Sequence, residues 1–333
     1  MDFPDRPGTR PSRRADPVRV RRGEERQFAP DEDEGPLEPR EGVPDDEETG
    51  SRGEPLPSTE APPRERSRRR SETVRRVLWA IPLIVLAVAV IVAGGEIFAA
   101  AMIAFAWIGL TEFFNMSARA RPMQGVAFAA VAGMIIAAHY GDSFHMVLAG
   151  VAFFPVMLAV GVMRPTLKNL TWSMAVTTFG IVWIGLPFAH AVLLRDLPDH
   201  GAALLVDVLV ATFFTDTFAY LGGRTLGHRP LAPRISPAKT VEGLAVGVFG
   251  GTLGFWAAGL YQDWMSGLDA LAMGLCIALL APIGDLFESA IKRDLDIKDS
   301  GKVFGPHGGL LDRLDGVLFT VVAGYYLSLW IVL

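Results

Sequence analysis

The sequence has only one cysteine, Cys276, in 333 residues. A single cysteine excludes an intramolecular disulfide and leaves no cysteine cluster for a zinc site. Cys276 lies inside an apolar run, so we expect it to be a small buried side chain. The sequence also has no internal repeat, although inverted repeats are common in membrane transporters.

Residues 1–76 almost entirely lack aliphatic clusters and are crowded with Arg, Asp, Glu, Pro and Gly. Such a segment cannot bury enough apolar surface to offset the entropy of the chain. We therefore expect a disordered, charged and proline-rich cytosolic tail. The tail is too long to be the charged region of a secretory signal, and no small-residue cleavage pattern follows it.

Residues 77–333 form a succession of apolar stretches, in a chain that is 50% hydrophobic with a mean hydropathy of +0.32. A helix of about 20 residues crosses the ~30 Å hydrocarbon core of a bilayer. We expect an all-α polytopic integral membrane protein with about nine transmembrane helices and a cytosolic-side active site. The spans are expected near residues 77–94, 96–115, 124–140, 144–163, 171–193, 201–221, 241–261, 268–287 and 316–333.

Basic residues occur in alternate gaps between these spans. The gaps after odd-numbered spans contain only one, Arg195. The gaps after even-numbered spans carry Arg119, Arg121, Arg164, Lys168, Arg224, Arg229, Arg234, Lys239, Lys292, Arg293, Lys298 and Lys302. The positive-inside rule then places the N-terminus and these basic loops on the cytosolic side of the inner (plasma) membrane. The two longest cytosolic loops, residues 222–240 and 288–315, are where we expect the chemistry.

The second long loop combines acids and bases at helical spacing. Asp285, Ser289 and Lys292 fall at i, i+4 and i+7 if the eighth helix continues, so they share one face. Asp312 and Asp315 are three residues apart at the start of the ninth span, and their carboxylates can converge on one cation. Carboxylates together with substrate phosphates suit Mg²⁺. We expect Asp285, Asp312 and Asp315 to bind Mg²⁺, with helix capping or a salt bridge as the alternative and a second cation left open.

Other residues of this loop have more than one interpretation. Lys302 and its basic neighbours could contact anionic lipid headgroups. His307 could be a general base, a metal ligand or a turn residue. Gly308 and Gly309 allow positive φ and a close backbone approach, as a phosphate-binding loop needs.

In the first long loop, Ser236 and Pro237 look like the N-cap and first turn of the seventh helix. A helix N-terminus beside Lys239 and Thr240 would be a site for an anion. Asp216, near the inner end of the sixth span, is the acid of this region that we connect with function.

Two more acids, Glu112 and Asp207, lie inside apolar spans. Ionisable groups in such positions are costly and usually serve function. Neither has a motif partner in the sequence, so either could be a buried hydrogen-bonding group.

Both long loops resemble the motif regions of the phosphatidate cytidylyltransferase (CDP-diacylglycerol synthase) family. The family signature runs Ser-x-aliphatic-Lys-Arg, four residues, Lys-Asp, a Gly-rich stretch, His-Gly-Gly and Asp-Arg-x-Asp. One departure concerns the local turn: members often read Pro-Gly before His-Gly-Gly, whereas this chain has Gly305-Pro306. Upstream, Asp-Thr-x-Ala-Tyr-x-x-Gly begins at Asp216 and Ile-Ser-Pro-x-Lys-Thr-x-Glu-Gly begins at Ile235. The signature positions are occupied by Ser289, Lys292, Arg293, Lys298, Asp299, His307, Gly308, Gly309, Asp312, Arg313 and Asp315.

The resemblance implies that residues 77–333 form a transmembrane cytidylyltransferase domain. It implies transfer of the cytidylyl group of CTP to phosphatidate, with Mg²⁺ held by the acids named above. The implied partners are CTP and phosphatidic acid in the bilayer, without nucleic acid, and a homodimer is left open. The residues implied to be catalytic are Lys292, Arg293, Lys298, Asp299, His307 and Arg313. The residues implied to bind substrate are Asp216, Tyr220, Arg224, Ser236, Lys239, Thr240, Ser289, Gly308 and Gly309.

Two other functions are alternatives. A lipid-alcohol kinase or an archaeol-type cytidylyltransferase would also use CTP and a basic, metal-bearing loop, and a test of lipid acceptors would separate these enzymes. A transporter would use intramembrane acids to relay protons or ions. The motif acids instead gather at the cytosolic edge of the expected spans, which argues against transport.

Overall fold

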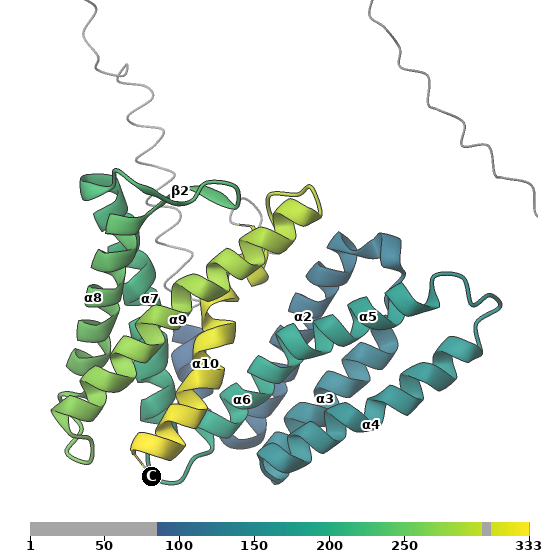
Figure 1. Ribbon diagram of the computed structural model, residues 1–333. Helices are drawn as coiled ribbons and strands as arrows, with labels where there is room; N and C mark the ends of the chain where they lie inside the picture. The colour runs from purple at the N-terminus through teal and green to yellow at the C-terminus, as the bar shows by residue number, and fades with distance from the viewer. Residues whose placement is uncertain (1–84, 302–307, 333) are drawn as a thin grey trace, which may run out of the picture. The chain divides into compact units, whose positions relative to one another are not determined.

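The computed structural model describes residues 85–301 and 308–332 (Figure 1). The expected tail, residues 1–76, lies outside the described residues, as do Lys302 and His307. Residues 85–93 are helical, and a break at Gly94 precedes the first labelled helix. The helices are α2 (Gly95–Met116), η1 (Ala118–Ala120), α3 (Gln124–Tyr140), α4 (Ser143–Val162), α5 (Leu170–Gly180), η2 (Ile181–Gly185), α6 (Leu186–Arg195), α7 (Gly201–Leu226), α8 (Val241–Gly259), α9 (Gly267–Asp294) and α10 (Leu311–Ile331).

The described part of the chain contains 7 helices that are long and apolar enough to cross a membrane. One of these is the continuous segment Leu170–Arg195, which joins α5, η2 and α6. Helix α3 is apolar but has only 17 residues, and the helix at 85–93 belongs to an expected span that is only partly described. The chain is therefore a helical multi-pass membrane protein, while the count of nine spans stays a prediction.

Helices α7, α8, α9 and α10 pack together, and α10 also contacts α6 (Figure 1). Helix α6 in turn contacts α2 and α3. The contact between α10 and α6 therefore joins the group α7–α10 to the group α2, α3 and α6. Aromatic rings strengthen this junction. Trp183 of η2 lies 5.5 Å, between ring centroids, from both Phe113 of α2 and Phe287 of α9. These contacts hold the ends of α2 and α9 in fixed positions beside the start of α10.

The loop between α7 and α8 contains a short antiparallel hairpin, so the expectation of an all-helical chain needs correction there. Strand β1 is Pro230–Ala232 and strand β2 is Ser236–Thr240. Two backbone N–H groups, those of His228 and Arg229, donate to the Glu242 carboxylate at 3.1 and 3.2 Å and hold the hairpin beside α8.

The predicted N-cap at Ser236 is also wrong, because residues 236–240 pair with β1 and the helix starts later. Thr240 is the N-cap of α8, and its hydroxyl accepts a hydrogen bond from the Gly243 N–H at 3.1 Å. Both Ser and Thr are favourable N-caps, so local preference alone does not choose between them. The tertiary pairing of the hairpin makes the choice.

Glycine allows α7 and α8 to approach each other closely. A Cβ added at Gly247 of α8 would lie 2.7 Å from the Ala219 Cβ and 2.8 Å from the Thr215 carbonyl oxygen, both on α7. Backbone and Cβ atoms cannot rotate out of the way. Small residues at helix contacts are a common way to pack helices in membranes, where apolar burial between helices gives little drive.

We predict that Gly247→Ala lowers the free energy of unfolding by about 1–3 kcal/mol, because the added methyl group overpacks the α7–α8 contact. Thermal unfolding in detergent, followed by circular dichroism, measures the effect. Gly259→Ala on the same helix is the matched control, since its Cβ would lie 3.7 Å from the Ala270 Cβ, an ordinary contact. Equal unfolding temperatures for the two variants would contradict this account of the packing.

Candidate active site

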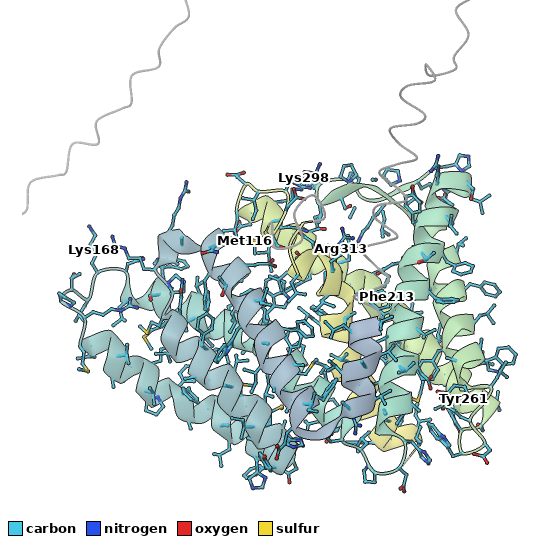
Figure 2. The ribbon with its side chains drawn as sticks, turned by 180° about the vertical axis from the view of Figure 1, so that it is seen from behind. Met116, Lys168, Phe213, Tyr261, Lys298 and Arg313 are labelled. Carbon is cyan, nitrogen blue, oxygen red and sulfur yellow. The ribbon has the colours of Figure 1, made fainter. Side chains whose placement is uncertain are left out.

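The two long loops meet at one end of the helices. Arg293, near the end of α9, donates from Nε to the Ile235 carbonyl oxygen at 3.2 Å and from Nη1 to the Ile297 carbonyl oxygen at 3.3 Å. Its guanidinium therefore joins the hairpin loop to the segment that follows α9. Lys168 and Lys298 lie at this same end, and Tyr261 lies at the other (Figure 2).

One charged group, the Lys239 cluster, joins Lys239 of β2 with Asp216 of α7, Asp285 of α9 and Asp315 of α10. The Lys239 ammonium forms an ion pair with Asp285 and attracts the carboxylates of Asp216 and Asp315. These carboxylates repel each other and Asp285. Three carboxylates against one ammonium leave the cluster with an excess of negative charge, and such a site favours a further cation.

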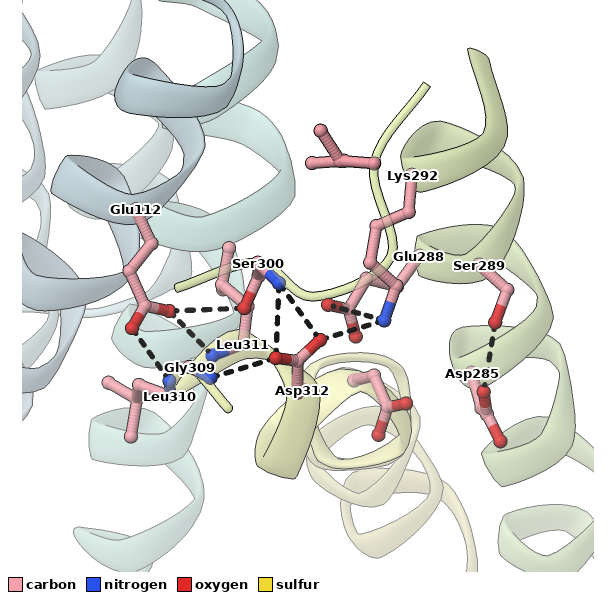
Figure 3. A network of polar contacts seen from close by, with 12 residues as sticks. Glu112, Asp285, Glu288, Ser289, Lys292, Ser300, Gly309, Leu310, Leu311 and Asp312 are labelled. Carbon is pink, nitrogen blue, oxygen red and sulfur yellow. Dashed lines mark hydrogen bonds and ion pairs between the residues drawn. The ribbon is translucent and has the colours of Figure 1, made fainter. Parts of the chain in front are cut away.

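The shared face predicted for Asp285, Ser289 and Lys292 of α9 is confirmed for Asp285 and Ser289, whereas Lys292 contacts Glu288 and Asp312 instead. The Ser289 hydroxyl donates to Asp285 Oδ1 at 3.3 Å, so the two side chains share one face of α9 (Figure 3). A hydroxyl beside the carboxylate fixes the rotamer of Asp285. The face that carries Asp285 therefore points to the Lys239 cluster.

A second group, the Asp312 cluster, surrounds the first turn of α10 (Figure 3). Lys292 Nζ donates to Asp312 Oδ1 at 2.8 Å, and it lies 3.3 Å from Glu288 Oε1. The Asp312 carboxylate also accepts from the N–H groups of Ser300 at 3.1 Å and Gly309 at 2.8 Å. Glu288 is fully buried, and Lys292 and Asp312 are only 12% and 13% exposed. The Asp312 carboxylate is thus occupied by three donors: the Lys292 ammonium and two backbone N–H groups.

The structure therefore does not bring Asp285, Asp312 and Asp315 together as one site. In the described ranges, no group of three His, Cys, Asp or Glu side chains is arranged closely enough to hold a metal ion. The oxygen-only donors of the Lys239 cluster still fit Mg²⁺ in chemical type. Asp312 fits less well, because its oxygens already accept hydrogen bonds from Lys292 and two backbone N–H groups.

The other predicted substrate residues lie around these clusters. Arg224 Nη1 donates to the Tyr220 hydroxyl at 3.3 Å on the exposed end of α7. Ser236 lies in β2 and not at a helix N-terminus. Thr240 is the N-cap of α8, so the helix N-terminus predicted beside Lys239 and Thr240 is present. Gly308 has a φ of 84°, as expected for a loop glycine, and Gly309 is buried against α10.

Three predicted catalytic residues are exposed around the same end of the helices. Lys298 and Asp299 lie on the segment after α9, and Arg313 lies on the first turn of α10. His307 lies outside the described residues, so its role stays a prediction.

Glu112 of α2, named from the sequence as an intramembrane acid without a partner, is a buried hydrogen-bonding group. It accepts hydrogen bonds from the Leu310 N–H at 2.9 Å and the Leu311 N–H at 3.0 Å. The Ser300 hydroxyl donates to the same carboxylate at 3.4 Å. Sequence reasoning missed Ser300 and Glu288, and of these two only Glu288 had a local signal, since it precedes Lys292 by four residues on a helix.

Comparison with known proteins assigns the chain to a family. The cytidylyltransferase family model matches residues 74–331. An alignment of 290 residues with the phosphatidate cytidylyltransferase of Synechocystis sp. has 31% identity and covers 76% of this chain and 95% of that protein.

Two other relatives match a shorter part. The phosphatidate cytidylyltransferase of Bacillus subtilis is 36% identical over 154 residues, which cover 45% of this chain and 56% of the relative. Uncharacterized protein YnbB of Escherichia coli is 39% identical over 165 residues, covering 48% of this chain and 53% of the relative. In these two alignments the chain spans about half the length of the relative. The family model spans most of the chain, both long loops included, and the chain therefore belongs to the cytidylyltransferase family.

Proposed function

We propose that this protein is a phosphatidate cytidylyltransferase that converts CTP and phosphatidate to CDP-diacylglycerol and diphosphate in phospholipid biosynthesis. The Lys239 cluster is the observation that carries the proposal, because it brings acids and a base from both motif loops to one place. The Synechocystis and Bacillus relatives, both phosphatidate cytidylyltransferases by name, support the same substrate.

In the proposed reaction, a phosphate oxygen of phosphatidate forms a bond to the α-phosphorus of CTP. The bond from that phosphorus to the bridging oxygen of the β-phosphate breaks, and diphosphate leaves with the electron pair. The second pKa of a phosphate monoester is about 6, so phosphatidate is mostly a dianion at neutral pH. The nucleophile therefore needs no protein base, and the barrier lies in bringing two polyanions together and stabilising the leaving diphosphate.

We propose that Asp285 and Asp315 hold Mg²⁺ in the enzyme together with substrate phosphates and water, and that Asp216 adds negative charge beside them. The bound ion would supply positive charge to the phosphate oxygens. Asp312 was part of the predicted metal site, but its hydrogen bonds to Lys292 and to backbone N–H groups support a different task. We assign to Asp312 the positioning of Lys292 and of the first turn of α10.

The phosphate groups of the two substrates need cations as well as the metal. We propose Lys239, Arg293, Lys298 and Arg313 for this task, since they come from both motif loops. Lys298 and Arg313 lie toward the same end of the helices (Figure 2). Lys292 is nearly buried between Glu288 and Asp312, so its ammonium is directed to these acids. Phosphate binding by Lys292, predicted from the motif, would require a change of partner.

We propose that this end of the helices faces the cytosol at the inner membrane, where CTP is available. The basic loops support that orientation through the positive-inside rule, and it leaves the N-terminus in the cytosol. The phosphate of phosphatidate would then enter the site from the bilayer surface while its acyl chains stay between lipids. Sideways entry between helices is consistent with the many large apolar side chains exposed on the helices.

We predict that the purified protein with CTP, phosphatidate and Mg²⁺ forms a cytidine-bearing lipid and releases diphosphate. Asp315→Asn should lower kcat/KM by on the order of 100-fold, because the Lys239 cluster loses a carboxylate that stabilises the bound cation. Asp263→Asn is the matched control, since Asp263 is exposed in the loop between α8 and α9 at the other end of the helices.

Equal activity of the parent and Asp315→Asn would remove Asp315 from the metal site. If the parent made no cytidine-bearing lipid but phosphorylated a lipid alcohol, a lipid kinase would replace the proposed enzyme. Radiolabelled CTP in the two assays, labelled in the base or in the γ-phosphate, separates these outcomes.

A second prediction distinguishes the two aspartates of the Asp-Arg-x-Asp motif by stability. Asp312→Asn should lower the free energy of unfolding by about 1–3 kcal/mol, because Lys292 loses a nearly buried charged partner. Asp315→Asn should leave stability unchanged or raise it, because it relieves repulsion from Asp216 and Asp285. Chemical unfolding in mixed micelles, without added Mg²⁺, measures both. A larger loss for Asp315→Asn than for Asp312→Asn would contradict the assignment.

A further inference from the structure

The start of α10 has no capping side chain of its own. The residue at its N-cap position is Leu310, which has helical backbone angles and cannot accept a hydrogen bond through its side chain. The first N–H groups of a helix have no partner within the helix and need one from elsewhere. In this chain the partner is the carboxylate of Glu112, which lies 198 positions before Leu310 in the sequence.

The Glu112 carboxylate is built into this position. Its side chain is 4% exposed, and its oxygens accept from the N–H groups of Leu310 and Leu311. A Cβ added at Gly309 would lie 2.6 Å from Glu112 Oε2, and one at Gly301 would lie 2.7 Å from Glu112 Oε1. The chain thus approaches the carboxylate so closely that a side chain at either position would displace it from the N–H groups.

Electrostatics explains why a buried carboxylate is tolerated here. In the part of the chain that the structure describes, no lysine or arginine forms an ion pair with Glu112. The negative charge instead faces the N-terminus of α10, where the unpaired N–H groups carry partial positive charge. Two backbone donors and the Ser300 hydroxyl complete the compensation (Figure 3).

The helix that carries Glu112 is itself fixed. Phe113, the next residue, packs against Trp183, and Trp183 packs against Phe287 of α9. The aromatic packing through Trp183 therefore holds Glu112 of α2 in a fixed position relative to the end of α9, which carries Asp285. The hydrogen bonds from the start of α10 to Glu112 can then set the position of α10 relative to α9.

We infer that Glu112 is a positioning residue for the proposed cytidylyl transfer: it seats the N-terminus of α10 and thereby sets Asp312 and Asp315 against α9. The inference rests on the proposed function for its reaction, and on the hydrogen bonds of Glu112 for its geometry. Glu112 lies outside both motif loops. A shift of about 1 Å in a catalytic group can cost on the order of 100-fold in rate, so the seat of α10 matters to the chemistry.

The test compares the parent with Glu112→Gln and Glu112→Asp in lipid nanodiscs. Glu112→Gln keeps the shape but replaces one acceptor oxygen with an NH₂ group that faces N–H donors. Glu112→Asp keeps the charge but is one methylene shorter. Asp207→Asn is the matched control, because Asp207 is also fully buried but pairs with Gln262 in the loop between α8 and α9.

Amide hydrogen exchange, measured by mass spectrometry on peptides covering residues 308–316, reports how well the N–H groups at the start of α10 are protected. This measurement does not require enzymatic activity. We expect exchange at Leu310 and Leu311 to be about tenfold faster in Glu112→Gln, with Glu112→Asp between it and the parent. The Asp207→Asn control should keep the parent rate in these peptides. Unchanged exchange in both Glu112 variants would overturn the inference.

Steady-state kinetics with CTP and phosphatidate give the second readout. We expect Glu112→Gln to lower kcat at least about tenfold with a much smaller change in the KM for CTP, because the metal-binding acids are misplaced in the transition state. A kcat within twofold of the parent would overturn the positioning role even if exchange became faster. An inactive parent would refute the proposed function, while the exchange data would still decide whether Glu112 seats α10.

Discussion

The arrangement of α2, α7, α9 and α10 depends on one constraint: a carboxylate at the end of an apolar helix needs a compensating partner. An unpaired charge in a low-dielectric environment costs several kcal/mol, so each acid here must meet a cation or hydrogen-bond donors. For Glu112, Asp285 and Asp312 the partners include residues of other elements, and these pairings fix one helix against another. Lys292, the partner of Glu288, lies on the same helix. The acids concerned are Glu112, Asp216, Asp285, Glu288, Asp312 and Asp315.

The two clusters differ in how the negative charge of their carboxylates is compensated. This difference indicates which cluster has a structural role and which has a catalytic one. Around the start of α10, Lys292 and backbone N–H groups donate to Asp312. The two carboxylate oxygens of the buried Glu288 have no hydrogen-bond partner among the described residues, and the Lys292 ammonium lies 3.3 Å from one of them. Around Lys239, one ammonium faces three acids that repel one another. Asp312 is thus already bound by donors, whereas the Lys239 cluster gains stability from an additional positive charge. The Lys239 cluster therefore has the electrostatic character of a site for a cation and phosphates.

The sequence predicted the features that depend on local spacing. Long apolar runs predicted the spans, and the interval between Asp285 and Ser289 predicted a shared face that their hydrogen bond confirms. Contacts between distant segments could not be predicted in this way. The partners of Glu112 follow it by almost two hundred residues, and nothing near Glu112 in the sequence indicates them. Likewise, Ser236 and Thr240 are equivalent as local capping signals, and only the pairing of β2 with β1 decides between them.

The hydrogen bonds that hold the start of α10 also limit how phosphate groups can be bound. A helix N-terminus is a common site for phosphate because its N–H groups are unpaired. Here Glu112 and Asp312 already accept the N–H groups of Gly309, Leu310 and Leu311, so these donors are not available to a substrate. Two polyanionic substrates must then be met by side-chain cations and by the ion that the Lys239 cluster favours. An enzyme built in this way separates the task of holding α10 from the task of binding phosphate, and it assigns different acids to each.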